Sequence, residues 1–214
     1  MVEIIPAVLA TTEQQYQEDI RKLTQSESLS EDWVHIDFAD NKFVQNQTII
    51  PEVTKKFPTN LRKEAHLMVS YPTEWVEKLV DAGFKRIIFH IESADNIEEV
   101  IRNVKDKGLE VGLAINNETP VEKIEPFVGK IDVILVMTII PGFQGQPFIP
   151  EALDKIKAIK SKNWPAKIGV DGHVNNENAK EIVNTGADFM IVGSYLLKGD
   201  PDENLENLWE TING

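Results

Sequence analysis

The chain has 214 residues, of which 42% are hydrophobic and 27% charged, and its formal net charge is −13. This composition predicts an ordinary globular protein with a negative surface, which would repel nucleic acid and anionic lipid. Because the chain contains no cysteine, disulfides, thiolate zinc sites and a cysteine nucleophile are excluded.

The first residues of the chain predict a strand rather than a signal peptide. Residues 1–6 lack a basic region followed by a long apolar stretch. No segment of the sequence approaches the ~20 consecutive apolar residues that a membrane span needs. Together with the absence of cysteine, this pattern leads us to expect a cytoplasmic protein with no nucleic-acid or membrane partner.

Eight short, mostly apolar runs alternate with longer amphipathic segments along the chain. Runs that are apolar throughout, such as 133–137, are typical of strands buried on both faces of a parallel sheet. The predicted strands are 3–9, 33–37, 63–68, 86–91, 110–115, 133–137, 167–171 and 189–193.

Helical patterns lie between these strands, and three of them stop at a glycine that could form a left-handed C-cap. These helices are predicted over 74–82, 97–107 and 178–185, before Gly83, Gly108 and Gly186, and a further amphipathic helix is predicted over 202–212. Thr73 and Asp95 are candidate N-caps.

Eight strand–helix units of this length favour a single α/β domain over residues 1–214, a (β/α)8 TIM barrel. The alternative is an open, doubly wound sheet. It is less favoured because no glycine-rich fingerprint follows the first strand.

Histidine and aspartate gather at the predicted C-terminal ends of strands, where barrel enzymes carry their chemistry. His35 and Asp37 share one face of the second strand, His66 lies near the end of the third, and Asp171 closes the seventh. Two imidazoles and two carboxylates suit Zn²⁺, Fe²⁺, Mn²⁺ or Co²⁺ better than Ca²⁺ or Mg²⁺. A single histidine at a strand end is more often a hydrogen-bonded core residue than a metal ligand. Two buried carboxylates, however, need a cation or a shared proton.

Glycine-containing loops follow three neighbouring strands, the sixth, seventh and eighth. Gly145, Gly172 and Gly193 would let backbone N–H groups approach an anion, as phosphate sites in barrels require. Any one of these glycines could instead serve only a tight turn. Their clustering favours phosphate binding.

From residue 5 to residue 194 the chain resembles the ribulose-phosphate 3-epimerases. The segments that carry the resemblance are 35–40, 43–46, 66–69, 136–138, 141–143, 145–150, 170–172 and 193–194. The resemblance implies a barrel of the ribulose-phosphate-binding type that interconverts D-ribulose 5-phosphate and D-xylulose 5-phosphate, a step of the pentose phosphate pathway. It also implies a homodimer or a higher homo-oligomer.

The resemblance further implies roles for individual residues. His35, Asp37, His66 and Asp171 would bind one divalent metal ion. Asp37 and Asp171 would also be the catalytic acid and base, with proton transfer through a metal-stabilised enediolate. The implied substrate-binding residues are Ala7, Met68, Met137, Gly142, Gly145, Gly172, His173, Gly193 and Ser194, and backbone N–H groups of Gly145, Gly172, Gly193 and Ser194 would hold the phosphate.

Five positions depart from the family's pattern, and all lie in the shell that would face the substrate. Ala7 stands where the family has serine, Ala39 where it has methionine, and Ile140 where it has a polar residue. Gln144 and His173 stand where it has glycine. The proposed ligands are unchanged, so the identity of the sugar is what these departures leave open.

Three functions are alternatives to a 3-epimerase of ribulose 5-phosphate. A pocket floor widened at Ala39 would suit a six-carbon ketose phosphate such as allulose 6-phosphate. A related lyase would need a lysine in the barrel mouth, for which Lys42 and Lys63 are the nearest candidates. A barrel could also bind a sugar phosphate without turning it over.

Overall fold

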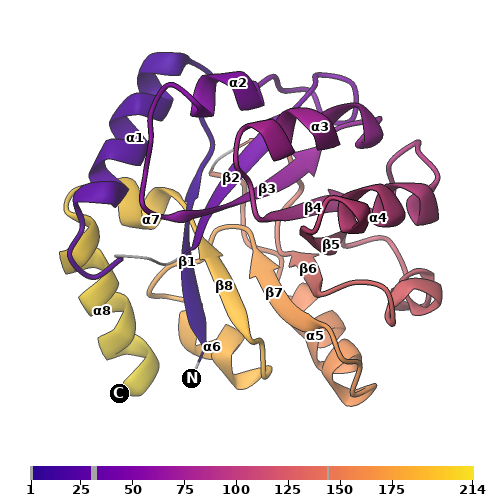
Figure 1. Ribbon diagram of the computed structural model, residues 1–214. Helices are drawn as coiled ribbons and strands as arrows, with labels where there is room; N and C mark the ends of the chain where they lie inside the picture. The colour runs from indigo at the N-terminus through magenta and orange to yellow at the C-terminus, as the bar shows by residue number, and fades with distance from the viewer. Residues whose placement is uncertain (1, 30–32, 144) are drawn as a thin grey trace.

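Eight strands, each paired in parallel with the next, close into a barrel in the computed structural model (Figure 1). The structure describes residues 2–29, 33–143 and 145–214. The strands are β1 (Glu3–Val8), β2 (Trp33–Ala39), β3 (Arg62–Met68), β4 (Arg86–His90), β5 (Glu110–Ile115), β6 (Val133–Met137), β7 (Lys167–Asp171) and β8 (Phe189–Val192). Pairing of β1 with β8 completes the ring. The predicted barrel is therefore confirmed, and each predicted strand agrees with the observed one to within two residues.

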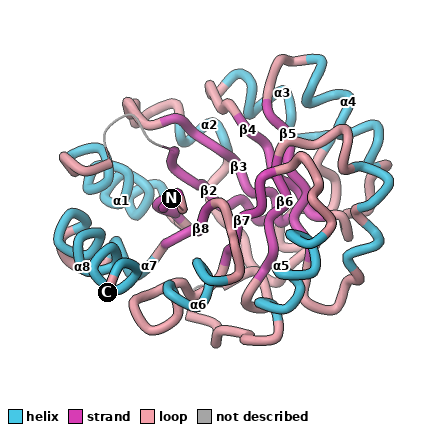
Figure 2. The backbone as a smooth tube through the Cα atoms, turned by 90° about the horizontal axis from the view of Figure 1, so that it is seen from below, coloured by secondary structure: helices cyan, strands magenta, loops and turns pink. Residues whose placement is uncertain are grey.

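Helices surround the strands on the outside of the barrel (Figure 2). They are α1 (Glu13–Gln25), α2 (Pro51–Thr54), α3 (Thr73–Asp81), α4 (Ile97–Asp106), α5 (Ala152–Ser161), α6 (Ala179–Asn184), α7 (Ser194–Leu197) and α8 (Pro201–Asn213). Two short 3-10 helices, η1 (Val121–Lys123) and η2 (Glu125–Phe127), connect β5 to β6. Within the described ranges, no helix combines the length and apolarity needed to cross a membrane.

Helix ends agree with the sequence analysis at the C-terminal side and differ at the N-terminal side. Gly83, Gly108 and Gly186 all have positive φ just after a helix, as predicted. The N-cap predictions were wrong. Thr73 is already the first residue of α3, because Pro72 before it has helical backbone angles. Asn96, not Asp95, caps α4, and the Asp95 carboxylate instead accepts a hydrogen bond from the Thr73 N–H.

Side chains alternate along each strand between two apolar layers. One layer lies between the strands and the helices and contains most of the buried hydrophobic residues. The other fills the barrel interior, with Trp33, Leu135 and Phe189 among its members. This inner layer is interrupted by charged and imidazole side chains on β2, β3 and β4, which are buried all the same.

Gly169 makes room for an aromatic ring in the inner layer. A Cβ atom at this position would lie 2.1 Å from two atoms of the Phe189 ring. We therefore expect Gly169→Ala to destabilise the fold by about 1–3 kcal/mol, the usual cost of overpacking a core. Urea unfolding would measure this difference. Gly129→Ala is the matched control, because a Cβ there meets nothing within 4 Å and its φ is not positive. Equal stability of the two variants would contradict the prediction.

Candidate metal centre and active site

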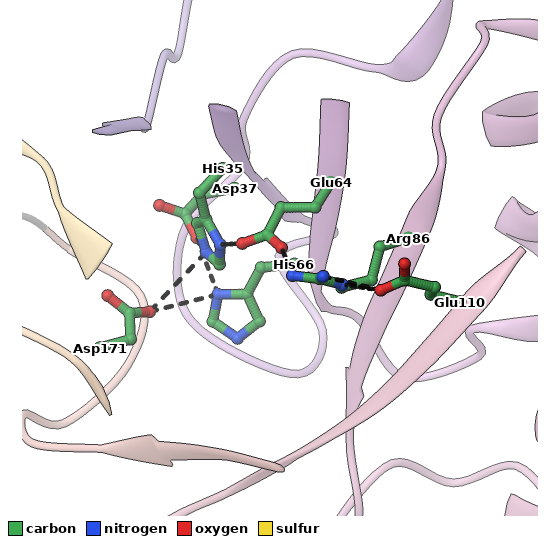
Figure 3. Close-up of polar contacts among 7 residues, drawn as sticks. All are labelled: His35, Asp37, Glu64, His66, Arg86, Glu110 and Asp171. Carbon is green, nitrogen blue, oxygen red and sulfur yellow. Dashed lines mark hydrogen bonds and ion pairs between the residues drawn. The ribbon is translucent and has the colours of Figure 1, made fainter. Parts of the chain in front are cut away.

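The four predicted metal ligands meet at the C-terminal mouth of the barrel. The parallel register places Asp37 of β2 beside His66 of β3, and His35 lies two residues before Asp37 on the same face. Asp171 reaches the same point from the end of β7. Figure 3 shows the four side chains turned toward one another.

The distances among these side chains suit a single bound ion. One nitrogen or oxygen atom from each lies within 4.8 Å of the other three. His66 Nδ1 is 2.8 Å from Asp37 Oδ1 and 3.5 Å from Asp171 Oδ2. His35 Nε2 is 3.4 Å from Asp37 Oδ1 and 3.9 Å from Asp171 Oδ2. Ligands bound at ~2.1 Å from one ion lie roughly 3–4 Å apart.

His35 Nε2 is the strongest sign that this cluster is built for a cation. The imidazole is fully buried, yet Nε2 has no hydrogen-bond partner among the described residues. It faces two carboxylates at distances too long for a hydrogen bond. A buried polar atom without a partner is costly, and a metal ion between the imidazole and the carboxylates would satisfy it.

The two carboxylates have opposite pKa shifts. Burial alone would raise the pKa of Asp37, but the neighbouring His35 and His66 hold the pKa of this carboxyl well below its usual range. Burial, and after it the charge of Asp37, raises the pKa of Asp171 to about 6. The geometry therefore places one ionised carboxylate next to one that takes up a proton readily.

Metal uptake should release protons, because His35 must become neutral to bind an ion through Nε2. Burial lowers the pKa of His35, but the nearby carboxylates of Asp37 and Glu64 outweigh it and raise this pKa well above 6.5. Asp171 also takes up a proton below about pH 6. We therefore expect metal binding to release protons, to release more of them below about pH 6, and to weaken as the pH falls.

Calorimetry in buffers of different ionisation enthalpy measures this release directly. Metal binding at pH 7 without proton release, or metal affinity that is independent of pH between 5 and 8, would contradict the prediction.

Glu64 of β3, which the sequence analysis did not identify as a site residue, contacts His35 on the neighbouring strand β2. Its Oε1 atom lies 2.6 Å from His35 Nδ1, and both side chains are fully buried. The second oxygen, Oε2, accepts a 2.6 Å hydrogen bond from Nη1 of Arg86. Burial would raise the pKa of Glu64, but His35 and Arg86 together lower it. Alternation along β3 could have predicted that Glu64 shares a face with His66, but its contact with His35 depends on the register between β2 and β3.

His66 has its own partner beyond the four-residue cluster. Its Nε2 atom is 2.9 Å from His90 Nε2, and His90 Nδ1 is 3.3 Å from Glu92 Oε2. Burial, and after it the charge of His66, lowers the pKa of His90 to about 4, so this ring is neutral at pH 7. With Nδ1 of His66 directed at the two aspartates, its Nε2–H can donate to His90, whose Nδ1–H donates to Glu92.

A cavity open to solvent lies over the cluster. Asp37 and Asp171 form part of its wall. All of the predicted substrate-binding residues line it as well: Ala7, Met68, Met137, Gly142, Gly145, Gly172, His173, Gly193 and Ser194.

Two departures from the family's pattern, Ala39 and Ile140, do not line this cavity. Ala39 is buried but is not part of the wall of this cavity, so the lining gives no support to a floor widened at that position. Ile140 is 65% exposed and borders a neighbouring depression. Gln144 lies outside the described residues.

The lysines considered for a lyase do not reach the cavity. Lys42 is exposed, and Lys63 donates to the carbonyl of Ala82 behind the strands. No lysine is found among the described residues that line the cavity.

Fold and site together define a class of protein, a (β/α)8-barrel enzyme with two imidazoles and two carboxylates at the mouth of the barrel. The chain matches the family model described as the ribulose-phosphate 3 epimerase family over residues 3–197. It is 34% identical to the ribulose-phosphate 3-epimerase of Schizosaccharomyces pombe over 216 residues, which covers 98% of this chain and 93% of that protein. It is 38% identical to the ribulose-phosphate 3-epimerase of Chlamydia muridarum, over 78% of this chain and 77% of that protein.

A third relative is the cytoplasmic isoform of ribulose-phosphate 3-epimerase from Oryza sativa subsp. japonica. It is 35% identical, over 87% of this chain and 85% of that protein. The chain therefore belongs to the ribulose-phosphate 3-epimerase family, and it is an isomerase of the sugar-phosphate epimerase type.

More distant solved structures share the fold. 3-Hexulose-6-phosphate synthase from Salmonella typhimurium superposes with a TM-score of 0.73 at 17% identity, over 99% of both chains. KGPDC from Streptococcus mutans also superposes with a TM-score of 0.73, at 10% identity, over 100% of this chain and 98% of that chain. At these identities the likeness concerns the barrel alone.

Proposed function

We propose that this protein interconverts D-ribulose 5-phosphate and D-xylulose 5-phosphate as a metal-dependent 3-epimerase. The observation that carries the proposal is the pair of carboxylates, Asp37 and Asp171, that meet His66 Nδ1 from separate strands at 2.8 and 3.5 Å and also line the cavity. The proposed reaction needs two groups of this kind, one on each face of the carbon that is inverted.

The carbon beside a ketose carbonyl is inverted by removing its proton from one face and delivering a proton to the other. Asp37 and Asp171 are suited to be the base and the acid, and they would exchange these roles when the reaction runs in reverse. His35 and His66, together with the two aspartates, would hold one divalent ion, for which Zn²⁺, Fe²⁺, Mn²⁺ and Co²⁺ are the candidates. When bound, such an ion supplies positive charge that stabilises the negative charge developing on the substrate oxygens.

Loops on neighbouring strands would hold the phosphate group. Backbone N–H groups of Gly145, Gly172, Gly193 and Ser194 are the proposed donors, and all four residues line the cavity. Gly172 has φ of +131°, and a Cβ atom there would lie 2.9 Å from the backbone nitrogen of Ile139. This close approach requires glycine and shapes the loop beside the proposed phosphate site.

A six-carbon ketose phosphate is the second candidate substrate. Ala7 presents a methyl group to the cavity where the family's pattern has a hydroxyl, and exposed His173 stands at the rim in place of glycine. Both changes alter contacts to the sugar without altering the proposed proton-transfer groups.

The test compares ribulose 5-phosphate with allulose 6-phosphate, using metal-replete protein in D₂O with NMR detection of the C3 proton. We expect C3 exchange and formation of the epimer, faster with the five-carbon sugar. If metal-replete, folded protein exchanges the C3 proton of no ketose 5- or 6-phosphate, the proposal fails. Binding without exchange would indicate a sugar-phosphate-binding barrel, and carbon–carbon cleavage a lyase.

We also propose that the protein acts in the cytoplasm, as a single-domain homodimer or higher homo-oligomer. Sedimentation of the purified protein at several concentrations would give the number of subunits. A monomer at all concentrations would exclude the oligomer.

A further inference from the structure

A row of three charged side chains, Glu64, Arg86 and Glu110, extends from His35, one of the four proposed ligands (Figure 3). The parallel registers align His35 of β2 with Glu64 of β3, Glu64 with Arg86 of β4, and Arg86 with Glu110 of β5. Glu64 is fully buried and Arg86 is 4% exposed, whereas the Glu110 side chain is 47% exposed. Because Glu110 is the first residue of β5, the row runs from His35 toward the N-terminal end of the barrel.

Stability alone does not account for this row. Burying an ion pair costs desolvation energy, and well-packed apolar residues of similar volume serve a core equally well or better. Other residues of the inner layer, such as Val133 and Phe189, are apolar. We therefore look for the reason for a buried Glu64 and Arg86 in their contacts, which lead to His35.

The contact with His35 has a chemical consequence. An ionised Glu64 can only accept a hydrogen bond, so the proton between the two side chains belongs to Nδ1 of His35, 2.6 Å away. The ring is then fixed with Nε2 pointing at Asp37 and Asp171, and this atom can offer a lone pair to an ion. A carboxylate bound to the other ring nitrogen also makes an imidazole a stronger ligand.

Arg86 holds Glu64 in this position. Its Nη1 atom donates to Glu64 Oε2 at 2.6 Å and its Nε atom donates to Glu110 Oε2 at 2.8 Å, while Nη2 forms an ion pair with the same Glu110 oxygen at 2.7 Å. The guanidinium also lies 4.0 Å from the centre of the Trp33 ring. With contacts on three sides, the arginine has little freedom, and neither has the glutamate.

We propose that Glu64 is a positioning residue for the metal site, and that Arg86 acts through it. Glu64 sets the orientation and the protonated nitrogen of His35, and thereby the affinity of the cluster for a divalent ion. This inference rests on the proposed metal-dependent function.

The test uses Co²⁺, with affinity measured by competition against a chelator and the visible absorption spectrum as a report of ligand geometry. E64Q keeps an acceptor of the same shape but removes the charge, and we expect 10- to 100-fold weaker binding and an altered spectrum. R86M should also weaken binding. Adding R86M to E64Q should weaken binding no further, because Arg86 acts only through Glu64. E110Q is the control, since it removes the other carboxylate partner of Arg86 and should leave the affinity within about threefold of native.

Thermal unfolding of the metal-free variants separates positioning from folding. E64Q leaves Arg86 without its buried partner and should lower the midpoint, whereas E64Q/R86M leaves no unpaired buried charge and should recover part of it. Metal affinity should stay low in both variants.

Metal affinity that recovers together with the midpoint would show a purely structural role and overturn the proposal. Native-like affinity and spectrum in E64Q would also overturn it. If the native protein itself binds no Co²⁺, the proposed metal-dependent function fails, which is a different outcome from unchanged binding in the variants.

Discussion

Replacing Asp171 by asparagine should lower the rate of epimerisation by about 10³-fold, within the range that one general acid or base contributes. The amide keeps the size of the side chain but can neither take nor give the proton at C3. Asp37 would remain able to remove a proton from whichever epimer presents it. In the variant, deuterium exchange into that one epimer should therefore continue although epimerisation is largely lost. NMR in D₂O would follow both processes in a single sample.

Asp81→Asn is the control for the Asp171 variant. It makes the same chemical change in a 72% exposed side chain that pairs with Lys55 on the surface. Its epimerisation rate should equal that of the native protein. An Asp171→Asn variant that epimerises within threefold of native would exclude Asp171 as acid or base.

Removing the metal should abolish epimerisation and lower the thermal midpoint of the fold. Without a cation, the carboxylates of Asp37 and Asp171 share one pocket, and Nε2 of His35 has no hydrogen-bond partner among the described residues. A metal present at 1,000 times its dissociation constant adds about 4 kcal/mol to the stability of the folded state. For a chain of this size that corresponds to a rise of roughly 10 °C. Calorimetric scans before and after dialysis against a chelator would measure the rise, and elemental analysis would identify the ion.

Two histidine variants make this second prediction specific. His66→Ala removes one proposed ligand, and the metal should then leave the thermal midpoint almost unchanged. His173→Ala removes an imidazole that also lines the cavity but lies outside the four-residue cluster, so the full rise should remain. Full activity in protein shown to be free of metal would contradict the proposed role of the cluster.

The sequence was a good guide to the strands because parallel strands buried on both faces are nearly continuous apolar runs. It also indicated which polar residues would meet, since His35, Asp37, His66 and Asp171 fall at strand ends that a closed barrel brings together. Helix starts were harder to predict. Asp95 and Asn96 are adjacent, and the sequence does not show which of them caps α4. The structure shows that Asn96 is the cap, whereas the Asp95 carboxylate accepts a hydrogen bond from the first residue of α3.

The partners of the proposed ligands could not be identified from spacing alone. Glu64 and Arg86 belong to strands whose other inward positions are mixed, and their pairing depends on the register between β3 and β4. A shift of one residue would turn Arg86 toward the helices. His90 lies near the end of the predicted strand 86–91, but only the structure shows that its ring contacts His66 and does not line the cavity.

The last helix, α8, is hydrogen-bonded to the loop that follows α1. Asp202 in the first turn of α8 accepts hydrogen bonds from the Ser26 hydroxyl at 2.5 Å and from the Ser28 N–H at 3.0 Å, both just beyond α1. Lys22 of α1 also donates to the carbonyl of Leu197, at 3.1 Å. During synthesis on the ribosome, β1 and α1 must therefore wait for some 170 further residues before their final neighbours exist. The first helix therefore reaches its final neighbours only after residues 197–202 have emerged from the ribosome.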